Sequence, residues 1–167
     1  MNIFYLSECP TDSARMQCDK HVVKMILESA QMLCTSHHVC PSDATLPDKF
    51  YKKTHTNHPS TMWVRECTGN YEWMCIHALA LCEEYTYRYG KVHASQKVIE
   101  WCCDNVPAIP VGSTTQMPQC MPDQYKADCS IEAYRHFYNV DKRSSFKCVW
   151  TKREEPKWWK EHLCLEV

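Results

Sequence analysis

Glycine is scarce in this chain, with only 3 among 167 residues. Loops that wrap phosphate groups need closely spaced glycines, and β-sandwiches and β-barrels use glycine in many of their turns. The sequence therefore argues against both kinds of structure. It also contains no Walker loop, no dinucleotide-binding fingerprint, no G-x-S-x-G nucleophile turn and no H-E-x-x-H zinc helix.

Long apolar runs and an excess of basic charge are missing as well. No stretch approaches the roughly 20 apolar residues of a membrane-spanning helix, so we expect no membrane association. The opening MNIFYLSECP has no basic segment followed by an apolar one, which predicts no secretory signal and a cytoplasmic location. The 19 basic and 20 acidic side chains give a net charge of −1, which excludes a surface coated throughout with positive charge.

Cysteine, by contrast, is abundant: there are 13, an odd number, without a single C-x-x-C pair. The chain is long enough for its own core and lacks a secretory signal, which favours reduced cysteines that pack as small hydrophobic groups. A zinc site stays open as the alternative, although no fragment has the spacing of a known finger. The fragments are His37-His38-x-Cys40, His55-x-x-His58 and His162-x-Cys164. We expect no metal and no cofactor.

Apolar residues recur at spacings of three and four along most of the chain, and no useful β alternation is present. The sequence predicts an all-α protein, a single compact domain over residues 1–167 with about four or five helices and long loops. The predicted helices cover residues 13–36, 60 or 68 to 89, 95–105, and a segment that Asp128 or Ser130 caps. Asp19 suits the start of a new helix, which predicts a kink near Cys18, and Gly90 suits the end of the second segment.

Two segments between or after these helices have an unusual composition. Residues 37–60 form a long connection with three prolines, of a kind that is usually functional or disordered. The tail, about residues 142–167, mixes seven cations with three tryptophans. Basic residues among aromatic ones suit contacts to phosphates and bases. The alternative is that the tryptophans dock the tail onto the core while the cations are simply solvated.

Three clusters of polar residues are candidates for chemistry. On the first helix, His21 and Glu28 are two turns apart on one side, so an imidazole and a carboxylate could line one cleft. The second cluster precedes the second helix, and the third surrounds that helix's end. The candidates for substrate contacts are Lys20, Lys24, His55, Asn57, His58, Arg65, Arg88 and Lys91. The alternatives are a solvated helix face, a capping loop, and cations that interact with the helix dipole.

Four blocks of the sequence resemble a family of short phage and bacterial proteins over nearly the whole chain. They are CDKHVVKM (18–25), TNHP (56–59), EYTYRYGK (84–91) and PQCMPDQYK (118–126). This resemblance implies no particular activity.

The layout is also similar to that of the pyrimidine-dimer DNA glycosylases of the phage endonuclease V type. Those enzymes are single-domain helical proteins. In them, a short N-terminal segment leads to a helix that carries the catalytic glutamate, with a histidine seven residues earlier. His21 and Glu28 match that spacing, and His58 together with the end of the following helix, Arg88-Tyr89-Gly90, resembles their middle section.

This second resemblance implies a mechanism. The N-terminal α-amine would attack the sugar C1′ of the damaged nucleotide, because α-amines titrate near neutral pH and can act as nucleophiles. Asn2 generally leaves the initiator methionine in place, so the amine is that of Met1. The implied catalytic set is Met1, Glu28 and His21. Glu28 would stabilise the sugar cation and assist strand cleavage, and phosphates would be held by Lys20, Lys24 and Arg65.

The sequence therefore predicts an enzyme that cleaves the N-glycosidic bond of DNA or a nucleotide, with an associated lyase activity. The alternatives are a non-catalytic phage-type protein that binds a nucleotide or a host protein, and another base-modifying enzyme. The expected partner is a nucleic acid or nucleotide, and a phage-encoded chain would act in the host cytoplasm. The sequence indicates no oligomeric state.

Overall fold

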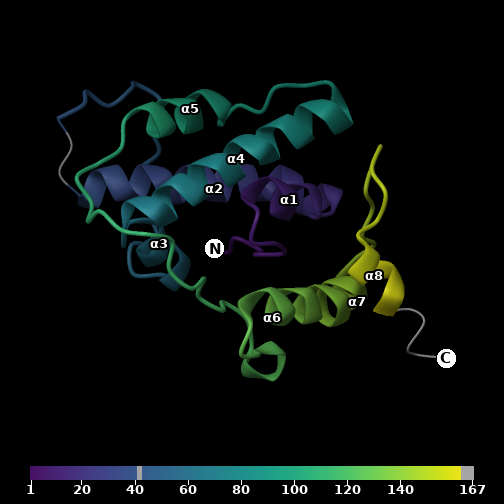
Figure 1. Cartoon of the computed structure of the whole chain (residues 1–167). Coiled ribbons are helices and arrows are strands. Elements are labelled where there is room, and N and C mark those ends of the chain that lie inside the picture. Colours follow the sequence, from purple (N-terminus) through teal and green to yellow (C-terminus); the bar gives the residue numbers. More distant parts are fainter. Residues whose placement is uncertain (41–42, 163–167) are drawn as a thin grey trace.

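The computed structural model describes residues 1–40 and 43–162, and these residues form a single compact all-helical domain, which confirms the predicted fold class. The elements are α1 (Pro10–Arg15), α2 (Asp19–Val39), α3 (Pro59–Val64), α4 (Thr68–Tyr89), α5 (Gln96–Asp104), η1 (Asp123–Tyr125), α6 (Ser130–Phe137), η2 (Tyr138–Lys142), α7 (Arg143–Ser145) and α8 (Lys157–His162). Helices α2 and α4 pack together, α1 lies on α4, and α5 lies on both long helices (Figure 1). None of the described helices has the length and hydropathy needed to cross a membrane.

The first predicted helix is divided in two. Helix α1 ends at Arg15 and α2 begins at Asp19. Between them, Cys18 has an extended backbone with φ −68° and ψ 162°. The backbone N–H of Asp19 donates to the Val149 carbonyl over 2.8 Å, so the tail of the chain satisfies a donor at the start of α2. The predicted kink near Cys18 is confirmed.

The second predicted helix is also divided, into α3 and α4. Helix α4 ends where the sequence indicates, because Gly90 takes the left-handed conformation (φ 65°) and donates its N–H to the Thr86 carbonyl. Near the start of α4, a Cβ atom on Gly69 would lie 2.5 Å from the backbone nitrogen of Thr114. Only glycine lets the connecting segment lie this close to the helix.

The predicted cap of the fourth helix is wrong. Helix α6 follows Cys129, and no side chain makes a capping hydrogen bond there. Instead, the hydroxyl of Ser130 donates to the Met117 carbonyl over 2.7 Å. The Ser130 side chain therefore holds the connection that contains Met117 against α6 and does not cap the helix.

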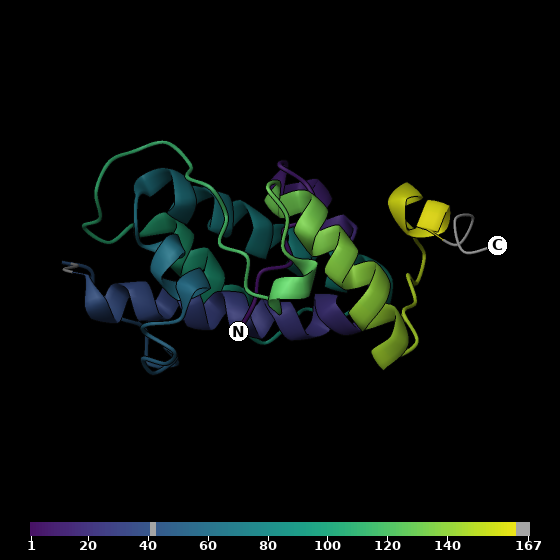
Figure 2. The same ribbon diagram turned by 90° about the horizontal axis from the view of Figure 1, so that it is seen from below.

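The N-terminal segment is buried in the fold, with Ile3, Phe4 and Leu6 at most 4% exposed. Figure 2 shows it running beside α2. The amide of Gln17 donates to the Ile3 carbonyl, and the hydroxyl of Ser13 donates to the Phe4 carbonyl while accepting the N–H of Leu6. Because buried backbone groups need partners, these side chains fix the path of the segment and hence the position of its first residues.

The described part of the tail docks onto the core. Trp150 and Trp159 are each 5% exposed, and the indole N–H of Trp150 donates to the Met16 carbonyl over 2.9 Å. The guanidinium carbon of Arg143 lies 3.7 Å from the centre of the Trp159 ring. These contacts favour the docking alternative over phosphate binding for these residues. Residues 163–167 of the predicted tail lie outside the described part of the chain.

Six of the twelve cysteines in the described part of the chain are buried, and all twelve are free thiols, as the sequence indicates. The buried ones are Cys18, Cys34, Cys67, Cys75, Cys82 and Cys102. In the core they pack as small apolar side chains. Cys18 is the exception, because the hydrogen bond from Cys148 and the nearby His21 hold the pKa of its thiol below the usual range.

His77 of α4 makes the stability of the fold depend on pH. It is fully buried, its Nδ1 lies 2.9 Å from the Pro10 carbonyl, and burial lowers its pKa to about 4. The unfolded chain therefore binds a proton near pH 6.5 that the folded chain binds only near pH 4, so the free energy of unfolding falls as the pH falls through this range. His77→Gln is expected to reduce this fall, measured by urea denaturation between pH 7 and pH 4.

His37 provides the internal control for that comparison. Its pKa is also lowered to about 4 by burial, and it is unchanged in the variant, so its contribution cancels in the difference. Parallel stability curves for the two proteins would contradict the assignment to His77.

Candidate active site

The first residue of the chain lies against a carboxylate of α2. The α-amino nitrogen of Met1 is 3.8 Å from Oε2 of Glu28, and the backbone N–H of Asn2 donates to the same oxygen over 2.9 Å. The other oxygen, Oε1, lies 3.3 Å from the ammonium of Lys24, one helical turn earlier. The Glu28 side chain is only 12% exposed. A partly buried carboxylate therefore sits between an α-amine and a lysine.

His58 is the next member of this cluster, because the charges of the Met1 amine and of Glu28 affect its pKa. It precedes α3, and its Nδ1 accepts the backbone N–H of Ser60 over 3.2 Å. Burial is the largest cause that lowers the pKa of His58, and the positive charges of the Met1 amine and His55 lower it further. The negative charge of Glu28 raises it. The neutral imidazole, with Nδ1 accepting, carries its proton on Nε2.

The segment that follows α5 contacts Asn2, the residue next to the amine. The side-chain amide of Asn2 donates to the Cys120 carbonyl over 3.0 Å, and the Cys120 sulfur lies 3.2 Å from the hydroxyl of Ser60. The sequence reasoning gave no role to these residues. The only feature of the sequence that pointed to this segment is that Cys120 lies in the PQCMPDQYK block, and that block indicates no chemistry by itself.

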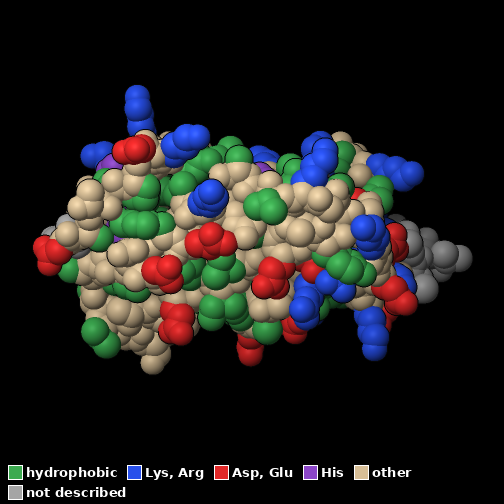
Figure 3. Space-filling model, turned by 90° about the horizontal axis from the view of Figure 1, so that it is seen from above, with side chains coloured by type: hydrophobic (Ala, Val, Ile, Leu, Met, Phe, Trp, Pro, Cys, Tyr) green, Lys and Arg blue, Asp and Glu red, His purple; other side chains and the backbone are tan. Residues whose placement is uncertain are grey.

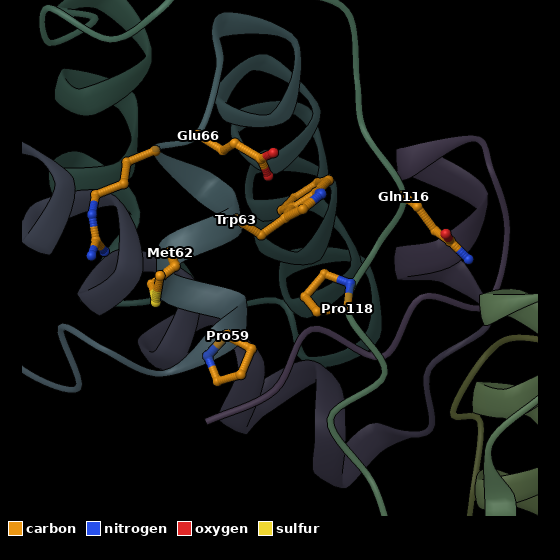
Figure 4. Close-up of a pocket in the computed structure, with 7 residues that line it drawn as sticks. Pro59, Met62, Trp63, Glu66, Gln116 and Pro118 are labelled. Carbon is orange, nitrogen blue, oxygen red and sulfur yellow. The ribbon is translucent and has the colours of Figure 1, made fainter.

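A groove of about 630 Å³ adjoins this cluster. It begins at Pro59, the neighbour of His58, and its lining comes from α3, the turn after α3 and the connection near Pro118 (Figure 4). The lining residues are Pro59, Met62, Trp63, Arg65, Glu66, Gln116 and Pro118. Arg65 also donates to the carbonyls of Thr56 and Thr61, which ties the histidine-containing loop to α3. The groove combines apolar and aromatic surface with a few charged and amide groups, as sites for flat polar ligands do.

His21 does not line a cleft with Glu28, contrary to the prediction. It is 5% exposed, its ring stacks on Phe4 with centroids 4.2 Å apart, and its Nδ1 is hydrogen-bonded to the hydroxyl of Tyr138 over 2.6 Å. Phe146 covers another edge of the ring. The histidine is therefore a core residue that holds the N-terminal segment against the tail, and a direct role in catalysis is not supported.

Arg88 is not available to a substrate, again contrary to the prediction. Its side chain is buried, and it donates to the carboxylates of Glu84 and Asp19 and to the carbonyls of Gln17 and Arg15. Every nitrogen of the guanidinium therefore has a protein acceptor. The arginine joins α4 to the junction of α1 and α2.

The other predicted contact residues lie on the surface in different places. His55 and Asn57 are exposed in the loop before α3, and His55 is near enough to affect the pKa of His58. Lys20 is exposed with its ammonium 4.4 Å from the centre of the Phe146 ring. Lys91 borders a separate shallow pocket beside Tyr85 and Tyr89. The structure thus brings together Met1, Lys24, Glu28, His55 and His58.

The described parts of the zinc fragments do not converge on a metal site. Nε2 of His37 is hydrogen-bonded to the hydroxyl of Tyr71, whereas Nε2 of His38 is hydrogen-bonded to the Tyr51 carbonyl. Across residues 1–40 and 43–162, no three or more His, Cys, Asp or Glu side chains are grouped so that they could hold a metal ion. Cys164 of the third fragment lies outside the described residues.

Comparison with known proteins gives one finding that bears on this cluster. A family model described as "Pyrimidine dimer DNA glycosylase" matches residues 1–97. The matched region contains Met1, Glu28 and His58, but it ends before the connection that carries Cys120. The curated proteins and the solved structures give no match.

Proposed function

Because the chain belongs to the pyrimidine dimer DNA glycosylase family, we propose that it cleaves the N-glycosidic bond of a dimerised pyrimidine in DNA and then cleaves the strand at the resulting sugar. The observation that carries this proposal is the 3.8 Å approach of the Met1 α-amine to Glu28. An amine that faces a carboxylate offers a nucleophile together with a counter-charge for a cationic sugar.

In the proposed reaction, the unprotonated α-amine of Met1 attacks C1′ of the damaged nucleotide. The new N–C1′ bond forms as the glycosidic bond breaks, and the base leaves with that electron pair and takes up a proton. Loss of the amine proton and opening of the sugar ring give an imine. Removal of a C2′ proton then expels the 3′ phosphate, which cleaves the strand. No oxidant or metal ion is needed for this sequence.

Glu28 stabilises the positive charge that develops on the sugar as the base leaves. Its Oε2 lies on the side of the amine, so the charge and the attacking nitrogen are close to the same carboxylate. Such preorganised charge acts more strongly in a partly buried site than in water. His58 stays neutral at physiological pH because its pKa is lowered, so it adds no positive charge beside the amine. A second positive charge there would oppose the same sugar cation.

The groove beside α3 is the proposed position of a nucleobase that leaves the stack. An enzyme that reacts at C1′ inside a duplex has to extrude the nucleotide, and an apolar, aromatic surface compensates for the lost stacking. Met62 is 50% exposed on this groove, with Trp63 behind it and Arg65 and Gln116 at its edges.

The proposed DNA contact is local, because the chain has no overall basic charge. On the face shown in Figure 3, acidic side chains lie across the centre among basic and hydrophobic ones, and no continuous basic track crosses that face. Beside the amine, the exposed Lys24 has its ammonium 3.3 Å from Glu28, and Lys20 is exposed one turn earlier on α2. We therefore place the damaged strand over the start of α2, with the extruded base toward α3.

Borohydride trapping tests the proposal. Incubation with a duplex that contains an abasic site, or a cyclobutane pyrimidine dimer, is expected to give a covalent protein–DNA adduct when borohydride reduces the imine. Adding two residues before Met1 moves the amine from Glu28 and is expected to lower the adduct yield at least about 100-fold, since the nucleophile is displaced. The same two residues inserted between Thr45 and Leu46, which are both exposed in the connection before α3, serve as the matched control.

Peptide mapping of the adduct identifies the reacting nitrogen. We expect the α-nitrogen of Met1, but the nitrogen of Asn2, at 2.9 Å from Glu28, would become the reacting amine in a chain from which Met1 is removed. DNA binding without any adduct, or an adduct on a lysine that the extension does not affect, would contradict the proposed chemistry. Binding alone would instead favour a non-catalytic protein.

A further inference from the structure

The side chain of Asn2 makes three hydrogen bonds that fix its orientation. Its Oδ1 accepts the backbone N–H groups of Ile3 and Phe4 over 2.8 and 3.3 Å. Its Nδ2 donates to the Cys120 carbonyl over 3.0 Å, a contact between residues 118 positions apart in sequence. The first contacts turn the chain just after Asn2, and the last ties that turn to another part of the molecule.

The carbonyl of Cys120 belongs to a well-anchored segment, residues 115–120, which we call the strap. The hydroxyl of Tyr134 accepts the N–H of Cys120 and donates to the Pro118 carbonyl. At the other end of the strap, Thr115 exchanges two hydrogen bonds with the side-chain amide of Asn70. The strap is thus held by α6 on one side and α4 on the other, and it presents the Cys120 carbonyl as a fixed acceptor.

The backbone around Asn2 links this acceptor to the reacting groups. The same residue that donates its side-chain amide to Cys120 donates its backbone N–H to Glu28, and its nitrogen is one peptide unit from the α-amine. First residues of a chain are usually poorly ordered unless they are tied down. Here, contacts to two separate parts of the molecule, Glu28 and Cys120, tie down the residue next to the amine.

We propose that Asn2 and the strap are positioning elements for the α-amine, with the Asn2–Cys120 hydrogen bond as the contact that holds the amine opposite Glu28. This inference rests on the proposed function. It also assigns a catalytic contribution to the strap, which lies beyond the matched residues 1–97. Neither element touches the substrate in this proposal, and both act through the amine.

Positioning of this kind affects the chemical step more than binding. A displacement of about 1 Å at a reacting group can cost about 100-fold in rate, while contacts to the DNA backbone remain unchanged. Loss of the Asn2 amide is therefore expected to lower the rate of imine formation at saturating DNA and to leave the affinity for the duplex intact.

The test compares Asn2→Leu, which removes both polar atoms at similar size, with Asn2→Asp, which keeps the acceptor for Ile3 and Phe4 but loses the donor to Cys120. Intact mass confirms that Met1 is retained in each. In single-turnover trapping on an abasic duplex, both variants are expected to react about 100-fold more slowly, with dissociation constants within about twofold of the unchanged protein. Asn105→Leu is the matched control, because it removes an amide that donates to a backbone carbonyl on α5.

Tyr134→Phe tests the strap without altering the N-terminal residues. It removes the hydroxyl that anchors Cys120 and is expected to slow trapping about 10-fold at unchanged affinity, while thermal unfolding reports whether the fold is retained. Trapping at the normal rate by Asn2→Asp would overturn the role of the Cys120 contact, and equal losses of rate and affinity would indicate a structural role alone. Failure of the unchanged protein to give an adduct would instead contradict the proposed function.

Discussion

Glu28→Gln is expected to slow glycosidic cleavage about 1,000-fold with the fold intact. The amide has nearly the same shape and keeps an oxygen to accept the Asn2 N–H, so the N-terminal segment should remain in place. It carries no negative charge, so it cannot stabilise the sugar cation or assist removal of the C2′ proton. The measurement is the single-turnover rate at which a duplex with one cyclobutane dimer acquires an alkali-cleavable abasic sugar, because the excised base stays joined to its partner in the dimer. Circular dichroism and thermal unfolding report whether the fold is retained.

Glu83→Gln is the matched control for this prediction. Glu83 is exposed on α4, and its replacement makes the same change in net charge and volume. It is expected to leave the rate of glycosidic cleavage unchanged. Equal rates for Glu28→Gln and the unchanged protein would show that the carboxylate beside the amine has no part in the reaction, and equal losses in both variants would indicate a general effect of charge on DNA binding.

Glu84→Gln is expected to lower the free energy of unfolding by about 3–5 kcal/mol, the usual cost of breaking a buried ion pair by removing one partner. Glu84 is 3% exposed, and its carboxylate lies 3.0 Å from Arg88 and 2.6 Å from Arg153. The change leaves the buried Arg88 guanidinium with only Asp19 as a charged partner. The measurement is urea denaturation at pH 7 followed by circular dichroism.

The neighbouring Glu83→Gln again serves as the control, with an expected change within about 0.5 kcal/mol, because surface substitutions away from such networks have small effects. Replacing Glu84 and Arg88 together by Gln and Met should cost less than the sum of the two single changes, since the buried guanidinium and the buried carboxylate that face each other are removed together. A loss of under about 1 kcal/mol for Glu84→Gln would mean that the arginines find other partners.

The sequence predicted the local features of the fold well, because each depends on residues close together in the chain. The all-α class, the kink before Asp19 and the end of α4 at Gly90 follow from apolar spacing and from the conformational preferences of single residues. The predicted cap of α6 was wrong because the Ser130 hydroxyl donates to the carbonyl of Met117, 13 residues earlier in the chain, and no side chain accepts a backbone N–H at the start of the helix.

The misplaced site residues show what periodicity cannot specify. A seven-residue spacing puts His21 and Glu28 on one side of α2, but it does not say which part of that side other elements cover. Tyr138 and Phe146, more than 100 residues later, bury His21. Neither covers Glu28, which lies beside the α-amine of Met1. The position of Glu28 beside the first residue came from a resemblance, not from spacing.

The burial of Arg88 and the role of the strap could not be predicted from the sequence for the same reason. A cation in the last turn of a helix is well explained by the helix dipole, so nothing local predicts that Arg88 is buried against Asp19 and Gln17. The Cys120 carbonyl is a backbone group, and residue type contains no information about where a backbone acceptor points.

The packing of Phe4 bears on whether the matched portion, residues 1–97, can exist as an autonomous unit. The ring of Phe4 lies against Tyr134, Phe137 and Tyr138, all from the last third of the chain. A fragment of residues 1–97 alone would expose the Phe4 ring to water, and the N-terminal segment would lose its packing partners on that side. The more conservative design for a minimal enzyme is therefore to graft a different C-terminal half that supplies an equivalent aromatic lining.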